Sequence, residues 1–175
     1  MKRYFIVLGV IAFIFICFIV FYQYKENNDH GMKAKVNTLM GHSVFGIWST
    51  YNEIVNNNSE LTNDNLEDIY FKLSVMEGYS LTVDKVTETH LMVPITNSMI
   101  SISKKLIENF EKQQSFTEND QEQYSDLLQY VNKMYSLIML YYIPNSEGKV
   151  SLTISQTNKN EIKIVRDELK EYTNK

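Results

Sequence analysis

Apolar residues along this chain form one unbroken run near its beginning and a series of periodic stripes after it. The run spans residues 4–22 and contains no charged residue. An α-helix rises about 1.5 Å per residue, so a helix of this length crosses the roughly 30 Å hydrocarbon core of a bilayer. Because lipid offers no hydrogen-bond partners, the backbone of such a run must be helical. We therefore predict that residues 4–22 form a single transmembrane anchor in contact with the lipid bilayer.

A cleaved signal peptide is the main alternative for this run, and the basic residues Lys2 and Arg3 before it suit that interpretation. The apolar core of a signal peptide is usually about 7–15 residues long, which is shorter than this run. No cleavage site with small residues follows Tyr22. We therefore expect an anchor that is not cleaved.

The orientation of the anchor depends on its basic flanks, because Lys and Arg are more frequent on the cytoplasmic side of a membrane. Two basic residues within residues 1–3 directly precede the run, whereas Lys25, Lys33 and Lys35 lie on the other side. The two flanks nearly balance, and the pair that directly abuts the run favours a short cytoplasmic end over residues 1–3. We then expect the bulk of the chain outside the cytoplasm, at the cell membrane.

Residues 23–35 are polar and include a turn-like Asn-Asn-Asp-His-Gly sequence, so we interpret them as a stalk. After the stalk, apolar residues recur at spacings of three and four, which is typical of helices with one buried face. The periodic stretches cover residues 36–55, 64–83, 95–110, 124–142 and 162–172. We predict one helical-bundle domain over residues 36–175.

Several of these stretches begin with residues that favour the start of a helix. Asp64 can cap the second stretch, and Glu67 three residues later completes a capping box. Thr117 can cap the fourth, and the acidic residues after it, including Asp120, suit the helix dipole. Pro94 is expected in the first turn of the third helix or at a kink in it.

The fourth stretch is apolar nearly all round from residue 134 to residue 143, so we predict that it is the most buried helix and ends at Pro144. Residues 150–154 alternate between apolar and polar, which indicates either a strand or the start of the last helix. No partner strand is evident in the sequence. The predicted fold is all-α, with an N-terminal single transmembrane helix followed by an antiparallel four- to five-helix bundle.

Charge and cysteine content narrow the choice of partners. All 21 acidic residues follow Lys25, but only 14 of the 17 basic residues do, so residues 26–175 carry a formal charge of −7. Such a domain is repelled by nucleic-acid phosphates, and we expect no nucleic-acid partner. The only cysteine is Cys17, so no intramolecular disulfide can form. The abundance of Lys, Asn, Ile and Tyr is typical of proteins from AT-rich bacterial genomes.

Sequence motifs give little support for catalysis. Ser101 and Lys104 match the S-x-x-K pattern of penicillin-recognising serine enzymes, but the companion S-D-N and K-T-G triplets are absent from the sequence. His30, His42 and His90 do not fall in a metal-binding motif. We therefore expect no catalytic residue, no metal and no cofactor, and we do not expect an enzyme.

A candidate surface for a partner or ligand comes from the tyrosines and methionines of the fourth stretch and from the only tryptophan. Tyr is amphipathic and Met adapts its shape, so both are frequent on binding surfaces. The alternative is that these periodic positions simply form the core of the bundle. The candidate residues are Trp48, Tyr130, Met134, Tyr135, Met139, Tyr141 and Tyr142.

Together these features predict a membrane-anchored, extracytoplasmic helical domain that acts as a binding or regulatory module at the cell envelope. Its partner would be another envelope protein or a small ligand held between helices. The alternative function is a self-associating envelope scaffold. An envelope enzyme with an unrecognised site is the least favoured interpretation.

Overall fold

The computed structural model describes the backbone of residues 35–36, 38–57, 60–139, 142–144, 150–152 and 156–174. The predicted transmembrane anchor over residues 4–22 and nearly all of the predicted stalk lie outside these ranges. Within them, no helix combines the length and the apolar character that crossing a bilayer requires.

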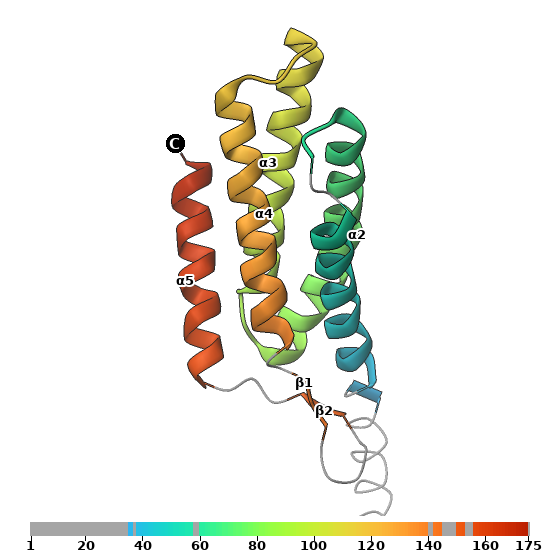
Figure 1. Cartoon of the computed structure of the whole chain (residues 1–175). Coiled ribbons are helices and arrows are strands. Elements are labelled where there is room, and N and C mark those ends of the chain that lie inside the picture. The colour runs from blue at the N-terminus through green and yellow to red at the C-terminus, as the bar shows by residue number, and fades with distance from the viewer. Residues whose placement is uncertain are drawn as a thin grey trace, which may run out of the picture. The chain divides into compact units, whose positions relative to one another are not determined.

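Five helices and a short two-stranded hairpin are described within the compact unit that spans Leu39–Lys175. The first covers residues 38–57. The others are α2 (Asn63–Thr87), α3 (Met92–Gln113), α4 (Glu118–Met139) and α5 (Gln156–Thr173). Successive helices run in alternating directions (Figure 1). The prediction of an antiparallel helical bundle is therefore confirmed for the described residues.

The helix of residues 38–57 contacts both α2 and α4. Glu53 on this helix forms an ion pair of 3.8 Å with Lys72 of α2. The ring of Tyr79 on α2 covers Gly46 so closely that a Cβ at position 46 would lie 2.6 Å from Cε2 of the tyrosine. Helix α5 packs against α3 and α4 on the other side of the bundle (Figure 1).

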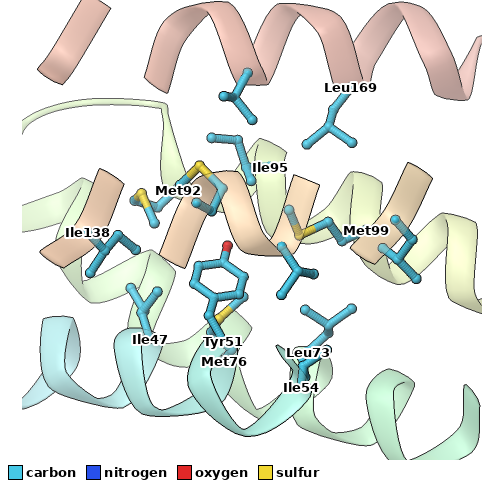
Figure 2. Close-up of a cluster of buried hydrophobic side chains, with 14 of the residues drawn as sticks. Ile47, Tyr51, Ile54, Leu73, Met76, Met92, Ile95, Met99, Ile138 and Leu169 are labelled. Atoms are coloured by element: carbon cyan, nitrogen blue, oxygen red, sulfur yellow. The ribbon is translucent and has the colours of Figure 1, made fainter. Parts of the chain in front are cut away.

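The core is formed by apolar side chains from all five helices (Figure 2). Most of the predicted stripe residues are buried there, whereas Val36, Leu39 and Val55 of the first stripe are exposed. The fully buried side chains of the largest volume are Tyr51, Ile47, Ile54, Leu66, Ile69, Leu73, Met76, Ile95, Met99, Leu106, Leu127 and Met134.

The predicted start of α4 is confirmed, and that of α2 is corrected. Thr117 Oγ1 accepts a hydrogen bond from Asp120 N at 3.2 Å, and Asp120 Oδ2 accepts one from Thr117 N at 2.9 Å, which makes a reciprocal capping box. In α2 the cap is Thr62, whose hydroxyl accepts from Asn65 N at 3.2 Å. The predicted cap, Asp64, lies inside the first turn because the threonine two residues earlier takes its role.

Burial of the Asp120 carboxylate raises its pKa, but the hydrogen bonds from Thr117 and Asn109 and the charge of Lys105 outweigh burial and leave the pKa below its usual value. The Asn109 amide donates to Asp120 Oδ1 at 2.8 Å. This carboxylate therefore joins α3 to the first turn of α4.

Helix α3 begins without a local cap and depends on a carboxylate from the preceding helix. Pro94 lies in its first turn, as predicted. The buried Asp84 of α2 accepts hydrogen bonds at 3.0, 3.0 and 2.9 Å from the backbone N–H groups of Leu91, Met92 and Val93. These N–H groups have no partners within their own helix, so Asp84 satisfies donors that would otherwise be left without acceptors.

The predicted continuation of the fourth helix to residue 143 is wrong. Helix α4 ends at Met139, and β1 (Tyr142–Pro144) follows. It pairs with β2 (Val150–Leu152) in an antiparallel hairpin, with Ile143 opposite Ser151. A proline disfavours helical geometry in the residue before it, and aromatic and β-branched residues favour strands. The uncertainty over residues 150–154 is thus resolved as a strand over residues 150–152.

Candidate functional site

Two of the predicted surface residues come together at the junction of the first helix and α4. The indole of Trp48 stacks on the ring of Tyr135, with ring centroids 6.1 Å apart and an interplanar angle of 25°. Both side chains are partly exposed. The two residues are far apart in the sequence, so their contact depends on the antiparallel packing of the two helices.

Phe45 extends this aromatic contact and was missed by the sequence analysis. Its ring lies 5.6 Å from that of Trp48 at an angle of 40°, and the side chain is 55% exposed. The available signal was the spacing of three residues between Phe45 and Trp48, which places both side chains on neighbouring positions of one helix. We call the cluster of Phe45, Trp48 and Tyr135 the aromatic seam.

The indole N–H of Trp48 is buried and has no acceptor among the described residues. A buried donor without a partner costs about 1–3 kcal/mol relative to a satisfied one. Tyr135, which stacks on the indole face, does not supply the missing acceptor. The seam therefore combines exposed aromatic surface with a hydrogen-bond donor that no described residue satisfies.

A hollow of about 430 Å³ lies further along the same face of α4. Its walls come from α4, from Phe116 just before α4, and from the segment that follows the first helix. Gln121 and Leu128 on its wall are 14 and seven residues before Tyr135, so all three side chains share one face of the helix. The residues that line the hollow are Glu60, Leu61, Phe116, Gln121, Tyr124, Ser125 and Leu128.

A long-range hydrogen bond joins two of the residues that line this hollow. Tyr124 Oη donates to the backbone oxygen of Glu60 at 3.1 Å, which holds the segment after the first helix against α4. Burial raises the pKa of Tyr124 to about 12. The phenol therefore remains a neutral donor at all physiological pH values.

Tyr130 lies on another side of α4, away from the seam. Its ring makes an edge contact with Tyr172 of α5, with centroids 6.2 Å apart and an angle of 71°. Burial, followed by the charges of Glu168 and Asp126, raises the pKa of Tyr130. Burial likewise raises the pKa of Tyr172, together with its hydrogen bond to Asp126. This pair joins α4 to α5 and has no direct connection with Trp48.

The remaining predicted surface residues do not add to the described seam. Met134 is fully buried in the core. The side chain of Met139 and the whole of Tyr141 lie outside the described residues, and Tyr142 is described only as backbone in β1. The seam therefore retains Trp48 and Tyr135 from the predicted set.

The residues considered for catalysis or metal binding are dispersed. Ser101 and Lys104 are exposed on α3, and Lys104 forms an ion pair of 3.8 Å with Glu108. His42 is exposed on the first helix, His90 is exposed in the connection between α2 and α3, and His30 lies outside the described ranges. The described residues include no group of three or more His, Cys, Asp or Glu side chains arranged to hold a metal ion.

Comparison of the chain with models of protein families, with curated proteins and with solved structures finds no match.

Proposed function

We propose that this chain is a membrane-anchored binding module whose helical bundle engages another cell-envelope protein through the aromatic seam. The observation that carries the proposal is the stack of Trp48 on Tyr135, next to the exposed ring of Phe45. Trp and Tyr combine a large apolar surface with a polar atom and are the residues most enriched at the energetic centres of protein interfaces.

The N–H of Trp48, which has no acceptor among the described residues, supports the same proposal. A partner that places a backbone carbonyl next to the indole gives this donor an acceptor and removes the free-energy cost of leaving it unsatisfied. Side-chain rotations at an interface are common on binding. The exposed ring of Phe45 lies against the indole and is free to change its rotamer on binding.

The apolar run over residues 4–22 supports the membrane part of the proposal. An anchor confines the bundle to the membrane surface and raises its effective concentration toward other proteins held there. A modest interface is then sufficient for binding.

Site-specific photocross-linking in intact cells tests the proposal. A photoreactive phenylalanine analogue at position 45 is expected to cross-link an envelope protein. The matched control is the same analogue at Ile164, which lies on α5 and is 53% exposed, against 55% for Phe45. Similar cross-linked products at the two positions, or none at position 45, would contradict the proposed site.

A second measurement uses the fact that Trp48 is the only tryptophan of the chain. Its fluorescence reports directly on the seam, and addition of the cross-linked protein is expected to shift the emission. Trp48→Phe keeps an aromatic ring but removes the N–H, and we expect it to weaken binding by about tenfold. Unchanged affinity in this variant would show that the indole N–H takes no part.

A further inference from the structure

Helix α2 is apolar on two opposite faces. One face supplies Leu66, Leu73 and Met76 to the core. The other exposes Phe71 and Val75, which are 66% and 50% exposed. A helix at the surface of a bundle normally has one apolar face, and contiguous exposed apolar residues indicate an interaction surface.

The exposed face follows the spacing of a helix–helix interface. Residues along it alternate in steps of four and three, the pattern that keeps a line of side chains facing one partner helix. The line consists of Asp64, Asp68, Phe71, Val75, Gly78, Thr82 and Lys85. We call this line the outer stripe of α2. Its apolar residues lie at the centre and its charged residues at the ends.

The outer stripe is complementary to itself when reversed. Phe71 and Gly78 lie equally far from the midpoint between Ser74 and Val75, on opposite sides of it. Gly78 is exposed, and a methyl group there would meet no described atom within 4 Å. In an antiparallel pair of α2 helices, the large ring of Phe71 therefore faces the open space at Gly78 of the second copy.

The charges at the two ends of the stripe give the same alignment. Asp64 and Lys85, both exposed, also lie equally far from the midpoint. Antiparallel pairing brings each aspartate next to a lysine of the other copy. Parallel pairing would instead bring two aspartates together at one end and two lysines together at the other. This repulsion disfavours the parallel arrangement.

We propose that the outer stripe of α2 is a dimerisation surface for a second copy of this chain, packed antiparallel about a two-fold axis near Val75. Such an interface is isologous, because each copy contributes the same residues and each contact occurs twice. The stripe shares no residue with the aromatic seam, so the dimer leaves the seam available.

Disulfide cross-linking of the full-length chain in detergent tests the geometry. The single native cysteine is first removed by Cys17→Ser. Val75→Cys places a thiol at the proposed axis, and Ile164→Cys is the control because the exposed fractions of the two native residues are 50% and 53%. Mild oxidation is expected to yield a covalent dimer at position 75 and not at position 164. Equal yields at the two positions, or none at position 75, would overturn the proposal.

Charge reversal tests the antiparallel alignment. Asp64→Lys and Lys85→Asp are each expected to weaken the dimer, and the double variant is expected to restore it, because the reversed pair has the same complementarity. Sedimentation velocity over a concentration series measures the dissociation constant. If the double variant is no tighter than the two single variants, the proposed alignment is wrong.

Gly78→Ala separates dimerisation from helix stability. Alanine favours helix formation over glycine, so this variant is expected to melt at a higher temperature as a monomer. It also fills the space that Phe71 of the second copy needs, so the dissociation constant is expected to rise by about tenfold. If Gly78→Ala dimerises as tightly as the native chain, the proposal is wrong. The proposal is also wrong if the thiol at position 75 cross-links only to a different protein.

Discussion

Two buried tyrosines differ in whether their hydroxyl groups have partners. Tyr51 is fully buried, and its hydroxyl has no hydrogen bond to any described residue. Figure 2 shows its oxygen among apolar side chains, on the side of the cluster that holds Met92 and Ile95. Tyr124, by contrast, donates to the backbone oxygen of Glu60. Loss of the hydroxyl therefore has opposite consequences at the two positions.

We predict that Tyr51→Phe raises the free energy of unfolding by about 1 kcal/mol, because it removes a buried polar atom that has no partner among the described residues. The matched variant Tyr124→Phe is predicted to lower it by about 1 kcal/mol, because it removes a satisfied hydrogen bond. Urea denaturation at neutral pH measures both. A destabilised Tyr51→Phe would mean that the hydroxyl has an acceptor in solution.

The burial of Tyr51 also predicts how the stability of the fold changes at alkaline pH. Burial raises the pKa of Tyr51 well above the ordinary value of about 10. In the unfolded chain the phenol ionises near pH 10, while in the folded chain it stays neutral. Ionisation of this phenol therefore leaves stability unchanged below about pH 10 and lowers stability as the pH rises toward the folded-state pKa. Tyr51→Phe should lose less stability than the native chain between neutral pH and pH 11.

At the scale of elements, the start of α3 depends on one side chain of α2. Asp84 accepts hydrogen bonds from the backbone N–H groups of Leu91, Met92 and Val93 and from the hydroxyl of Thr89. The carboxylate thus holds the short connection between the two helices and places the first turn of α3. Helix α3 contacts α2, α4 and α5, so the position of this turn affects most of the bundle.

We predict that Asp84→Ala lowers the free energy of unfolding by about 3 kcal/mol, because it leaves several buried donors without acceptors. Asp84→Asn keeps one acceptor oxygen and should cost less. The control is Glu77→Ala, which removes an exposed acidic residue from the same helix and should change stability by less than about 0.5 kcal/mol. Thermal and urea unfolding followed by circular dichroism measure all three. Equal effects of Asp84→Ala and Glu77→Ala would show that the carboxylate does not organise α3.

The helices themselves could be predicted because their signals are local. The capping box of Thr117 and Asp120 spans four residues, and the buried stripes repeat every three or four. The link from Asp84 to α3 could not be predicted, because it depends on where the chain turns after α2. The apolar stretch before Pro144 was ambiguous for a different reason, since a short apolar run suits a buried helix and a strand equally well.

The distinction between local sequence signals and contacts that depend on the fold also applies to the candidate site. Trp48 and Tyr135 were predicted individually from residue type, but their stacking depends on the register of two antiparallel helices. Phe45 was missed because it lies outside the buried stripe of its helix. The outer stripe of α2 was missed because the periodicity of Leu66, Leu73 and Met76 was sufficient to predict a helix with one buried face. The opposite face of that helix was therefore not considered as an interaction surface.

At the scale of the whole molecule, the bundle presents two separate apolar surfaces. Trp48 faces α4, whereas Gly46 on the same helix faces α2 and is covered by Tyr79. The first helix thus contacts α4 through Trp48 and α2 through Gly46, and the aromatic seam shares no residue with the outer stripe of α2. If residues 4–22 anchor the chain as proposed, the aromatic seam gains from confinement to a membrane, because it meets an envelope partner at a raised effective concentration.

We therefore predict that the two surfaces act independently. Phe71→Ala should abolish the disulfide cross-link from position 75 and leave the photocross-link from position 45 unchanged, and Trp48→Ala should do the reverse. Residues that share no contacts usually have additive effects, so the double variant should lose both cross-links without further change. Both cross-links are measured in the full-length chain in membranes. If Phe71→Ala also removes the cross-link from position 45, partner binding requires the dimer, and the seam is completed only when two copies are joined.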